Sequence, residues 1–248
     1  MSITFLYKNL LDSVISITEN ASVLQFGTSY IYDEDLNSAY RGTSGYGTTT
    51  ILFDFGTAVY ADSICCITNL TASGTLVLRA GTLSTVTDQA FGIPLDGFGT
   101  SYKYFGNNGF RYWRADLYGN TAISKHQCNE LFLGKRLIID QMPSYPLENN
   151  VEEDTVELTS EKGQRWVYHN YQRENFTFNF DGVNDITENN LYKMYRYCGK
   201  NTTPFFMNLN LDDNANNIKY VRFADKGFLS EEITKNTFDL TIELTEEI

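Results

Sequence analysis

Histidine, cysteine and proline are all scarce in this chain. Among its 248 residues, two are histidine, four are cysteine and four are proline. Zinc sites are built from clustered Cys and His ligands, and no Cys-x-x-Cys pair occurs here, so we expect no metal site. Cys65 and Cys66 are adjacent, while Cys128 and Cys198 stand alone. Because a free cysteine behaves as a small hydrophobe, we predict that the thiols are reduced and buried.

Long apolar runs and positive charge are also missing. No stretch approaches the roughly 20 apolar residues of a membrane span, and residues 1–20 lack the basic and apolar regions of a signal peptide. The chain has 19 Lys and Arg against 31 Asp and Glu, a net charge of -12. A protein this acidic is repelled by phosphate backbones, so we expect no nucleic-acid partner. Its two basic clusters are short, Arg111 with Arg114 and Lys135 with Arg136.

Catalytic motifs are absent as well. There is no Gly-x-Ser-x-Gly elbow, no cysteine in a catalytic context, and no partner set near His126 or His169. Carboxylates are plentiful, which leaves a glycosidase pair open, and the acidic residues 33–35 leave calcium binding open. We therefore predict a protein that is not an enzyme and that carries no cofactor.

What the chain does have is aromatic residues, at 15% of the composition, and these favour β structure. The first half indicates short strands with turns between them, over residues 48–56, 63–70 and 75–81. Asn108-Gly109 predicts a hairpin, in which the strand of Tyr102 and Tyr104 pairs back onto residues 110–117. Several short strands with few helical patterns predict a β-sandwich or jelly roll over residues 1–140.

The second half has a different pattern. Residues 141–164 hold two of the four prolines and a dense acidic run, which predicts an exposed connector. Residues 165–248 then predict an α+β domain, a single main helix on an antiparallel sheet. Its strands include a period-two run in which Phe176, Phe178 and Phe180 share one face. The helix is predicted over 187–200, capped by Thr187 and ended by Gly199, with apolar residues at 191, 194, 195 and 198.

The stretch "FGNNGFRYWRADLYGN" (105–120) is the densest mixture of aromatic and basic residues. In a strand, Arg111 and Trp113 point to one side, and Tyr112 points to the other. Such a strand suits a sugar platform, a stacking surface for nucleic acid or an ordinary core strand, and the core strand is favoured. The candidate ligand or interface residues are Tyr102, Tyr104, Arg111 and Trp113.

Four segments, in order, carry a resemblance: "NLLD" (9–12), "LFDFG" (52–56), "SICCITNL" (63–70) and "FRYWRADL" (110–117). Together they resemble the galactose-binding-like jelly roll of discoidin and coagulation-factor C domains, over about residues 5 to 120. The resemblance implies a mainly β fold with a jelly-roll sandwich, and glycan recognition as a possible function.

A second resemblance spans nearly the whole chain. "ELFLGKRLIID" (130–140), the acidic run, "RWVYHNYQRENFTFNF" (165–180), the helix and the final strand resemble tailed-bacteriophage minor tail or tail-tip proteins with a discoidin-like N-terminal domain. This implies a virion protein, assembled in the host cytoplasm, whose partners are copies of itself and other tail proteins, in a ring. The alternatives are a carbohydrate-binding module for host-surface glycans, and a head–tail connector or capsid decoration protein.

Overall fold

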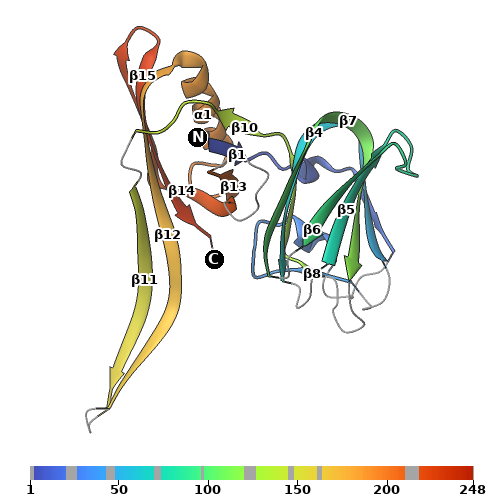
Figure 1. Cartoon of the computed structure of the whole chain (residues 1–248), viewed down its shortest axis with the longest axis horizontal. Coiled ribbons are helices and arrows are strands. Elements are labelled where there is room, and N and C mark those ends of the chain that lie inside the picture. Colours follow the sequence, from blue (N-terminus) through green and yellow to red (C-terminus); the bar gives the residue numbers. More distant parts are fainter. Residues whose placement is uncertain are drawn as a thin grey trace. The chain divides into compact units, whose positions relative to one another are not determined.

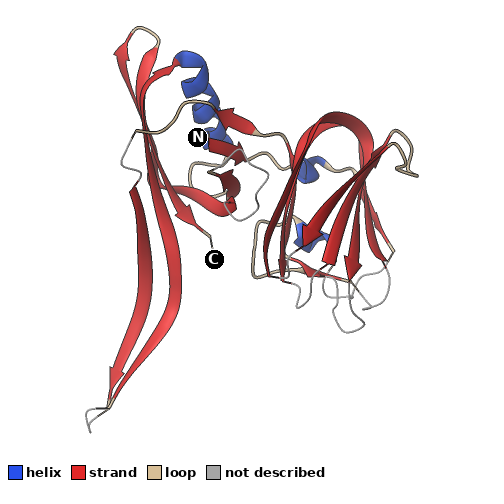
Figure 2. Cartoon of the chain, viewed as in Figure 1, coloured by secondary structure: helices blue, strands red, loops and turns tan. Residues whose placement is uncertain are grey.

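The computed structural model describes residues 3–20, 27–42, 48–69, 74–95, 98–119, 127–144, 148–160, 164–209 and 218–247. The chain forms two compact units. The sandwich unit comprises Thr4–Leu137 and Asn208–Ile218, and the sheet unit comprises Met1–Ile3, Ile138–Met207 and Lys219–Ile248. Strands dominate both units (Figures 1 and 2), which confirms the predicted mainly β class with a sandwich followed by an antiparallel sheet and a helix.

The described strands of the sandwich unit form a main sheet in the order β2-β4-β7-β5-β6, with β9 also pairing with β4. These strands are β2 (Ser16–Glu19), β4 (Thr48–Asn69), β5 (Gly74–Gly81), β6 (Gln89–Leu95), β7 (Phe98–Gly119) and β9 (Glu130–Gly134). Two short strands, β3 (Tyr40–Arg41) and β8 (Gln127–Cys128), pair with each other, and the 3-10 helices are η1 (Leu10–Ser13) and η2 (Thr28–Ile31).

The long strands β4 and β7 pair along their length and bend together, as the arch in Figure 1 shows. On one side of the bend, the first half of β4 pairs with β2, and on the other side its second half pairs with β9. The register shifts between Asp54 and Val59, where Gly56 has φ +72°, and again between Ala61 and Ser63. These irregularities let one pair of strands contribute to both layers of the sandwich.

Two details of the sandwich differ from the sequence-based expectation. The segments 48–56 and 63–70 are not separate strands, because β4 continues through the bend. The hairpin predicted at Asn108-Gly109 is wrong, because β7 is one strand from Phe98 to Gly119 and both of its halves pair with β4. Gly109 lies opposite Tyr60, and its missing side chain makes room for that ring instead of a turn.

The core of the sandwich unit gathers aromatic, aliphatic and thiol side chains from both layers. Trp113 is fully buried there, and its indole N–H donates to the Phe110 carbonyl at 3.1 Å. All four cysteines of the chain are buried, as predicted, and none of them forms a disulfide. Cys66 and Cys128 are in contact, with 3.2 Å between their sulfur atoms.

The described strands of the second sheet follow the order β10-β1-β13-β14-β15-β12-β11. Their bounds are β1 (Ile3–Leu6), β10 (Leu137–Ile139), β11 (Glu148–Thr159), β12 (Arg165–Asn184), β13 (Phe205–Asn208), β14 (Ile218–Thr234) and β15 (Thr237–Glu246). Phe176, Phe178 and Phe180 of β12 are buried on one face, as their spacing predicts.

The helix α1 (Asp185–Tyr197) packs on this sheet, where the Tyr195 ring contacts Phe223 and Phe228. It begins slightly earlier than predicted, since its cap is Asn184, whose side-chain oxygen accepts from the Thr187 amide at 2.9 Å. Gly199 follows the helix in a left-handed conformation, as expected of a stop. No helix in the described parts of the chain has the length and apolar character needed to span a membrane.

The predicted acidic connector is the largest difference. Half of residues 141–164 form β11, which pairs antiparallel with β12. The acidic side chains are tolerated in a strand because basic ones face them: Arg173 bonds Glu152 at 2.8 Å, and Arg165 pairs with Glu157. We call β11 and the Arg165–Glu174 part of β12 the ribbon, and Figure 1 shows it extending past the rest of its sheet.

Candidate functional site

A hollow of about 460 Å³ lies on the sandwich unit. Its lining residues come from the segment after β1, from the bend of β4 and from the segment after β9: Tyr7, Lys8, Leu10, Ala58, Val59, Tyr60, Lys135, Arg136 and Leu137. Aliphatic and aromatic side chains form most of the wall, with three basic residues among them. This mixture of an apolar wall and a few charged groups is typical of small-ligand sites.

Tyr60 is the most exposed aromatic side chain of this hollow, at 56%. Its ring lies across the β7 backbone at Gly109, where an added Cβ would come within 2.5 Å of the ring. Only glycine therefore fits at position 109 without moving the ring. The bend in β4 and the glycine in β7 together fix the position of this ring while leaving more than half of the residue exposed.

Basic groups surround this ring. The Lys135 ammonium nitrogen lies 5.2 Å from the Tyr60 ring centroid, within cation–π range. Arg136 stacks on the Tyr104 ring at 3.5 Å, and its backbone N–H donates to Asp62 at 3.1 Å. Among the described lining residues three are basic and none is acidic, although the chain as a whole has a net charge of -12. The Arg136 guanidinium is itself 4.0 Å from the Asp62 carboxylate, so Lys135 is the basic group beside the Tyr60 ring that could meet an anionic group.

The four residues predicted from the sequence do not form a single site. Trp113 lies at 0% exposure in the core, and Tyr102 is buried with its hydroxyl 3.4 Å from that of Ser63. Tyr104 is partly exposed beneath Arg136. Arg111 is at the surface and makes two hydrogen bonds to Asp54, both at 2.8 Å. Of the four, Tyr104 and Tyr102 are therefore joined to the hollow, both through Arg136, which stacks on the Tyr104 ring and interacts with the Tyr102 hydroxyl.

Two carboxylates on the same pair of strands have contrasting surroundings. The Arg111 guanidinium lowers the pKa of the partly exposed Asp54 to about 2, helped by the Gly56 amide. Asp116 is buried at 2% exposure and pairs with both Arg79 and Arg114 at 2.8 Å. Because its charge is out of water and doubly paired, Asp116 is a structural anchor between β5 and β7.

Glu130 at the start of β9 is also buried, at 2% exposure. Burial raises its pKa to about 9, although the carboxylate accepts a hydrogen bond from the Glu34 amide at 3.2 Å. The negative charges of Asp33, Glu34 and Asp12 raise the pKa further. Glu130 is therefore protonated at neutral pH, and keeping this proton costs folding stability as the pH rises above the ordinary pKa of a glutamate.

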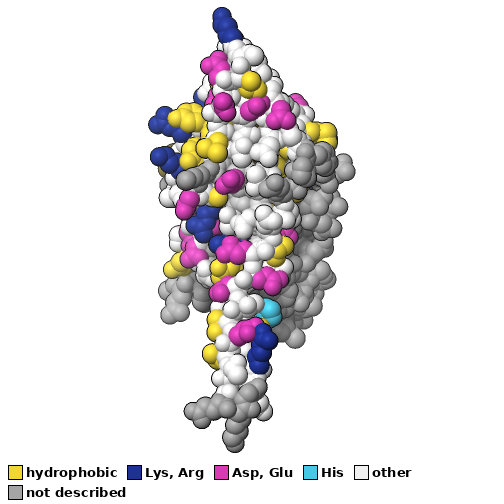
Figure 3. Space-filling model, turned by 90° about the vertical axis from the view of Figure 1, so that its left-hand side faces the viewer, with side chains coloured by type: hydrophobic (Ala, Val, Ile, Leu, Met, Phe, Trp, Pro, Cys, Tyr) yellow, Lys and Arg dark blue, Asp and Glu magenta, His cyan; other side chains and the backbone are white. Residues whose placement is uncertain are grey.

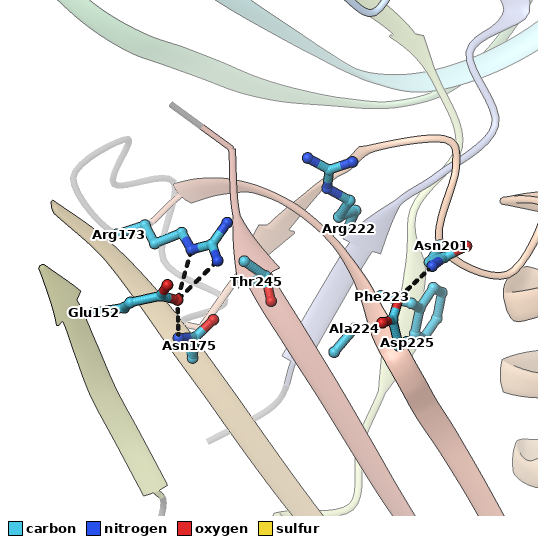
Figure 4. Close-up of a pocket in the computed structure, with 9 residues that line it drawn as sticks. All are labelled: Glu152, Arg173, Asn175, Asn201, Arg222, Phe223, Ala224, Asp225 and Thr245. Atoms are coloured by element: carbon cyan, nitrogen blue, oxygen red, sulfur yellow. Dashed lines mark hydrogen bonds and ion pairs between the residues drawn. The ribbon is translucent and has the colours of Figure 1, made fainter. Parts of the chain in front are cut away.

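The sheet unit has a smaller hollow, of about 360 Å³, drawn in Figure 4. Its wall is polar and its groups are paired with one another. Glu152 accepts from Arg173 at 2.8 Å and from Asn175 at 3.4 Å, and Asn201 donates to Asp225 at 2.7 Å. Because these polar groups already form hydrogen bonds with one another, this hollow has fewer groups available to bind a ligand than the hollow beside Tyr60.

Sequence reasoning missed Tyr60, which lines the hollow of the sandwich unit. The Lys135-Arg136 pair was visible as a basic cluster, but nothing in the sequence connects it with Tyr60, 75 positions earlier. The connection depends on the pairing of β9 with the second half of β4, which places the end of β9 near the bend. The Asn108-Gly109 pair marks a position where glycine is needed, but the glycine makes room for the Tyr60 ring and does not form a turn.

No protein-family model matches the chain, and no curated protein matches it either. Among solved structures, it is similar to chitosan-binding module 1 of a chitosanase/glucanase from Paenibacillus sp. IK-5, with 15% identity, a TM-score of 0.42, and 51% of this chain and 98% of that chain covered.

Two further solved structures are the CBM32-1 and CBM32-2 domains of Clostridium perfringens ZmpB with GalNAc, and the CBM32 of AlyQ with 4,5-unsaturated mannuronic acid. The first has 16% identity, a TM-score of 0.41, and coverage of 50% of this chain and 34% of that chain. The second has 17% identity, a TM-score of 0.37, and coverage of 48% and 94%. The solved structures named here are carbohydrate-binding modules, and each is similar to about half of this chain.

Proposed function

We propose that the sandwich unit binds carbohydrate, and that its ligand is a sugar carrying an acidic group. The observation that carries the proposal is the exposed Tyr60 ring, fixed over Gly109 beside Lys135. One face of a pyranose ring is lined by C–H groups and packs on an aromatic ring, while its hydroxyls remain in water or form hydrogen bonds. A carboxylate or sulfate on the sugar would meet the basic residues of the hollow.

The electrostatics favour an acidic sugar over a neutral one. The hollow is lined by Lys8, Lys135 and Arg136, and because the Arg136 guanidinium already pairs with Asp62 at 4.0 Å, the preference rests chiefly on Lys135 beside the Tyr60 ring. Binding of this kind weakens with salt, because the contacts are partly exposed to solvent. Among the similar solved structures, one holds an acidic sugar, 4,5-unsaturated mannuronic acid, and another holds the neutral sugar GalNAc, so the preference for an acidic sugar rests on the side chains of this chain. It assigns the unit a binding role without catalysis.

The test is a binding measurement with a panel of neutral, uronic-acid and sulfated oligosaccharides, followed by titration calorimetry on those that bind. Tyr60→Ala is expected to lower affinity about tenfold, the loss of one aromatic stacking contact. Tyr30→Ala is the matched control, since Tyr30 is an exposed tyrosine of the same unit outside the hollow. Lys135→Gln is expected to weaken acidic ligands selectively. No binding anywhere on the panel, or equal losses for the Tyr60 and Tyr30 variants, would contradict the proposal.

A second candidate function is a structural subunit of a tailed-bacteriophage tail. It is favoured by the ribbon, whose exposed apolar residues, such as Leu158 and Trp166, suit a protein that works in an assembly. The two functions are compatible, because a subunit of an assembly can carry a sugar-binding unit. Mass spectrometry of purified particles is the test: the chain should be present in several copies per virion, and its absence would remove this candidate.

A further inference from the structure

One face of the distal ribbon is apolar. Val156 lies directly opposite Tyr168, and Leu158 lies opposite Trp166. By the period of two these pairs lie on the same face of the ribbon. The four side chains are about half exposed, at 42% for Val156, 54% for Tyr168, 52% for Leu158 and 45% for Trp166. They form a contiguous cross-strand apolar patch that is open to solvent.

The opposite face is mainly polar. Thr155 lies opposite His169 there, and Glu157 lies opposite Val167. A surface ribbon in a finished monomer is expected to be polar on both faces or to cover a core with one of them. This one has an apolar face without a core beneath it, so a surface from outside the chain is needed to bury the patch.

The ribbon also has two open backbone edges. β11 is the last described strand of its sheet, and Arg165–Glu174 of β12 pairs only with β11 among the described strands. β15 joins β12 from Asn175 onward. A two-stranded ribbon is marginally stable alone in water, and open edges are ready to pair with another strand.

The charges of the two edges differ in sign. β11 has five acidic residues and no basic one: Glu148, Glu152, Glu153, Asp154 and Glu157. The facing segment carries Arg165 and Arg173, which pair with β11 inside one copy. Figure 3 shows acidic and basic side chains beside one another along the ribbon. Pairing β11 with another β11 would place like charges together, whereas pairing it with the Arg165–Glu174 edge continues the alternation of acidic and basic strands.

We propose that the partner of the ribbon is the ribbon of a second copy of this chain. The outer edge of β11 in one copy pairs with the outer edge of the Arg165–Glu174 segment in the next, and the apolar faces of successive copies lie side by side on the inner surface of the ring, where they face one another across it. Because the two edges differ, the contact is heterologous and a closed ring satisfies every copy. This deepens the second candidate function and does not depend on sugar binding.

Sedimentation velocity of the purified full chain over a range of concentrations tests the proposal. The wild type is expected to pass from monomer to a closed oligomer larger than a dimer. Trp166 emission should shift to the blue in parallel, because assembly buries its indole. Trp113, the second of the two tryptophans, is already buried and contributes a constant signal.

Leu158→Lys and Trp166→Lys are each expected to weaken self-association at least tenfold, by placing a charge in the apolar contact. Val167→Lys, on the polar face of the same ribbon, is the matched control and should assemble. Circular dichroism and thermal unfolding check that each variant is folded. Val156→Thr, which keeps the side-chain shape and the β propensity, gives the same comparison if a lysine variant fails to fold.

Three outcomes would overturn the proposal: a wild-type monomer at all concentrations, an assembly that stops at a two-fold dimer, or equal losses for the Leu158 and Val167 variants. The self-association measurement can be interpreted independently of the two candidate functions, sugar binding and a role in a phage tail. Absence of the chain from virions would leave self-association in place, and loss of sugar binding in the Tyr60 variant should not alter sedimentation.

Discussion

Replacing Glu130 by glutamine is expected to flatten the pH dependence of the stability of the sandwich unit. The pKa of this buried carboxyl is raised from the ordinary 4.5 to about 9, so the folded state keeps a proton that the unfolded chain releases. Folding stability is fully present below the lower value and is lost as pH rises towards the higher one, by about 1.4 kcal/mol per pH unit. Glutamine resembles the protonated acid and can still accept from the Glu34 amide.

Urea unfolding at mildly acidic and mildly alkaline pH measures this effect. In a Trp166→Phe background, Trp113 is the remaining tryptophan and reports on the sandwich unit. The Trp166→Phe protein that keeps Glu130 should lose stability as the pH rises. The same protein with Glu130→Gln should lose much less stability and should be the more stable of the two at alkaline pH. Parallel slopes for the two proteins would show that Glu130 is ionised in the fold.

Replacing Asp116 by alanine is expected to destabilise the sandwich unit by about 3 kcal/mol. Asp116 is 2% exposed and joins Arg79 and Arg114, so its removal leaves two guanidinium groups without their shared partner. The side chains of these arginines are 33% and 27% exposed, which lets them recover part of their hydration and limits the loss. The same Trp113 signal measures the change in the free energy of unfolding.

Asp54→Ala is the matched control for this prediction, because Asp54 also pairs with an arginine across β4 and β7 but at the surface. Water and salt screen that pair, so the control should change stability far less than Asp116→Ala. If the two variants lose the same stability, burial is not what makes Asp116 important.

Much of the fold follows from local patterns that the sequence displays. The alternation of Phe176, Phe178 and Phe180 predicts a half-buried strand. The spacing of Leu191, Met194 and Cys198 predicts the helix. Both patterns are readable because one face of a single strand or helix packs against one core. The predictions are wrong where the structure of a segment depends on a partner strand that is distant in the sequence. Asn108-Gly109 has the sequence of a turn, but β4 supplies a partner along the whole of β7. The acidic run becomes a strand because Arg165 and Arg173 lie opposite it.

The candidate site was harder to predict, for the same reason. Trp113 is the most prominent aromatic residue of its stretch, and it is buried because its side of β7 faces the core. Tyr60 has an ordinary sequence context and becomes prominent only through the bend in β4 and the glycine opposite. Whether an aromatic ring is exposed depends on how the two sheets pack on each other. The residue pattern of a single strand does not contain that information, so it does not predict the exposure.

The strand order of the sheet unit has a final consequence. β1 and β10 are neighbours in that sheet, and most of the sandwich unit is the stretch of chain between them. The chain therefore leaves this sheet and re-enters it on two neighbouring strands, so the stretch between them is an insertion into the sheet. Because both ends of this stretch meet on adjacent strands, its length and sequence can change without altering the order in which the strands of the sheet pair.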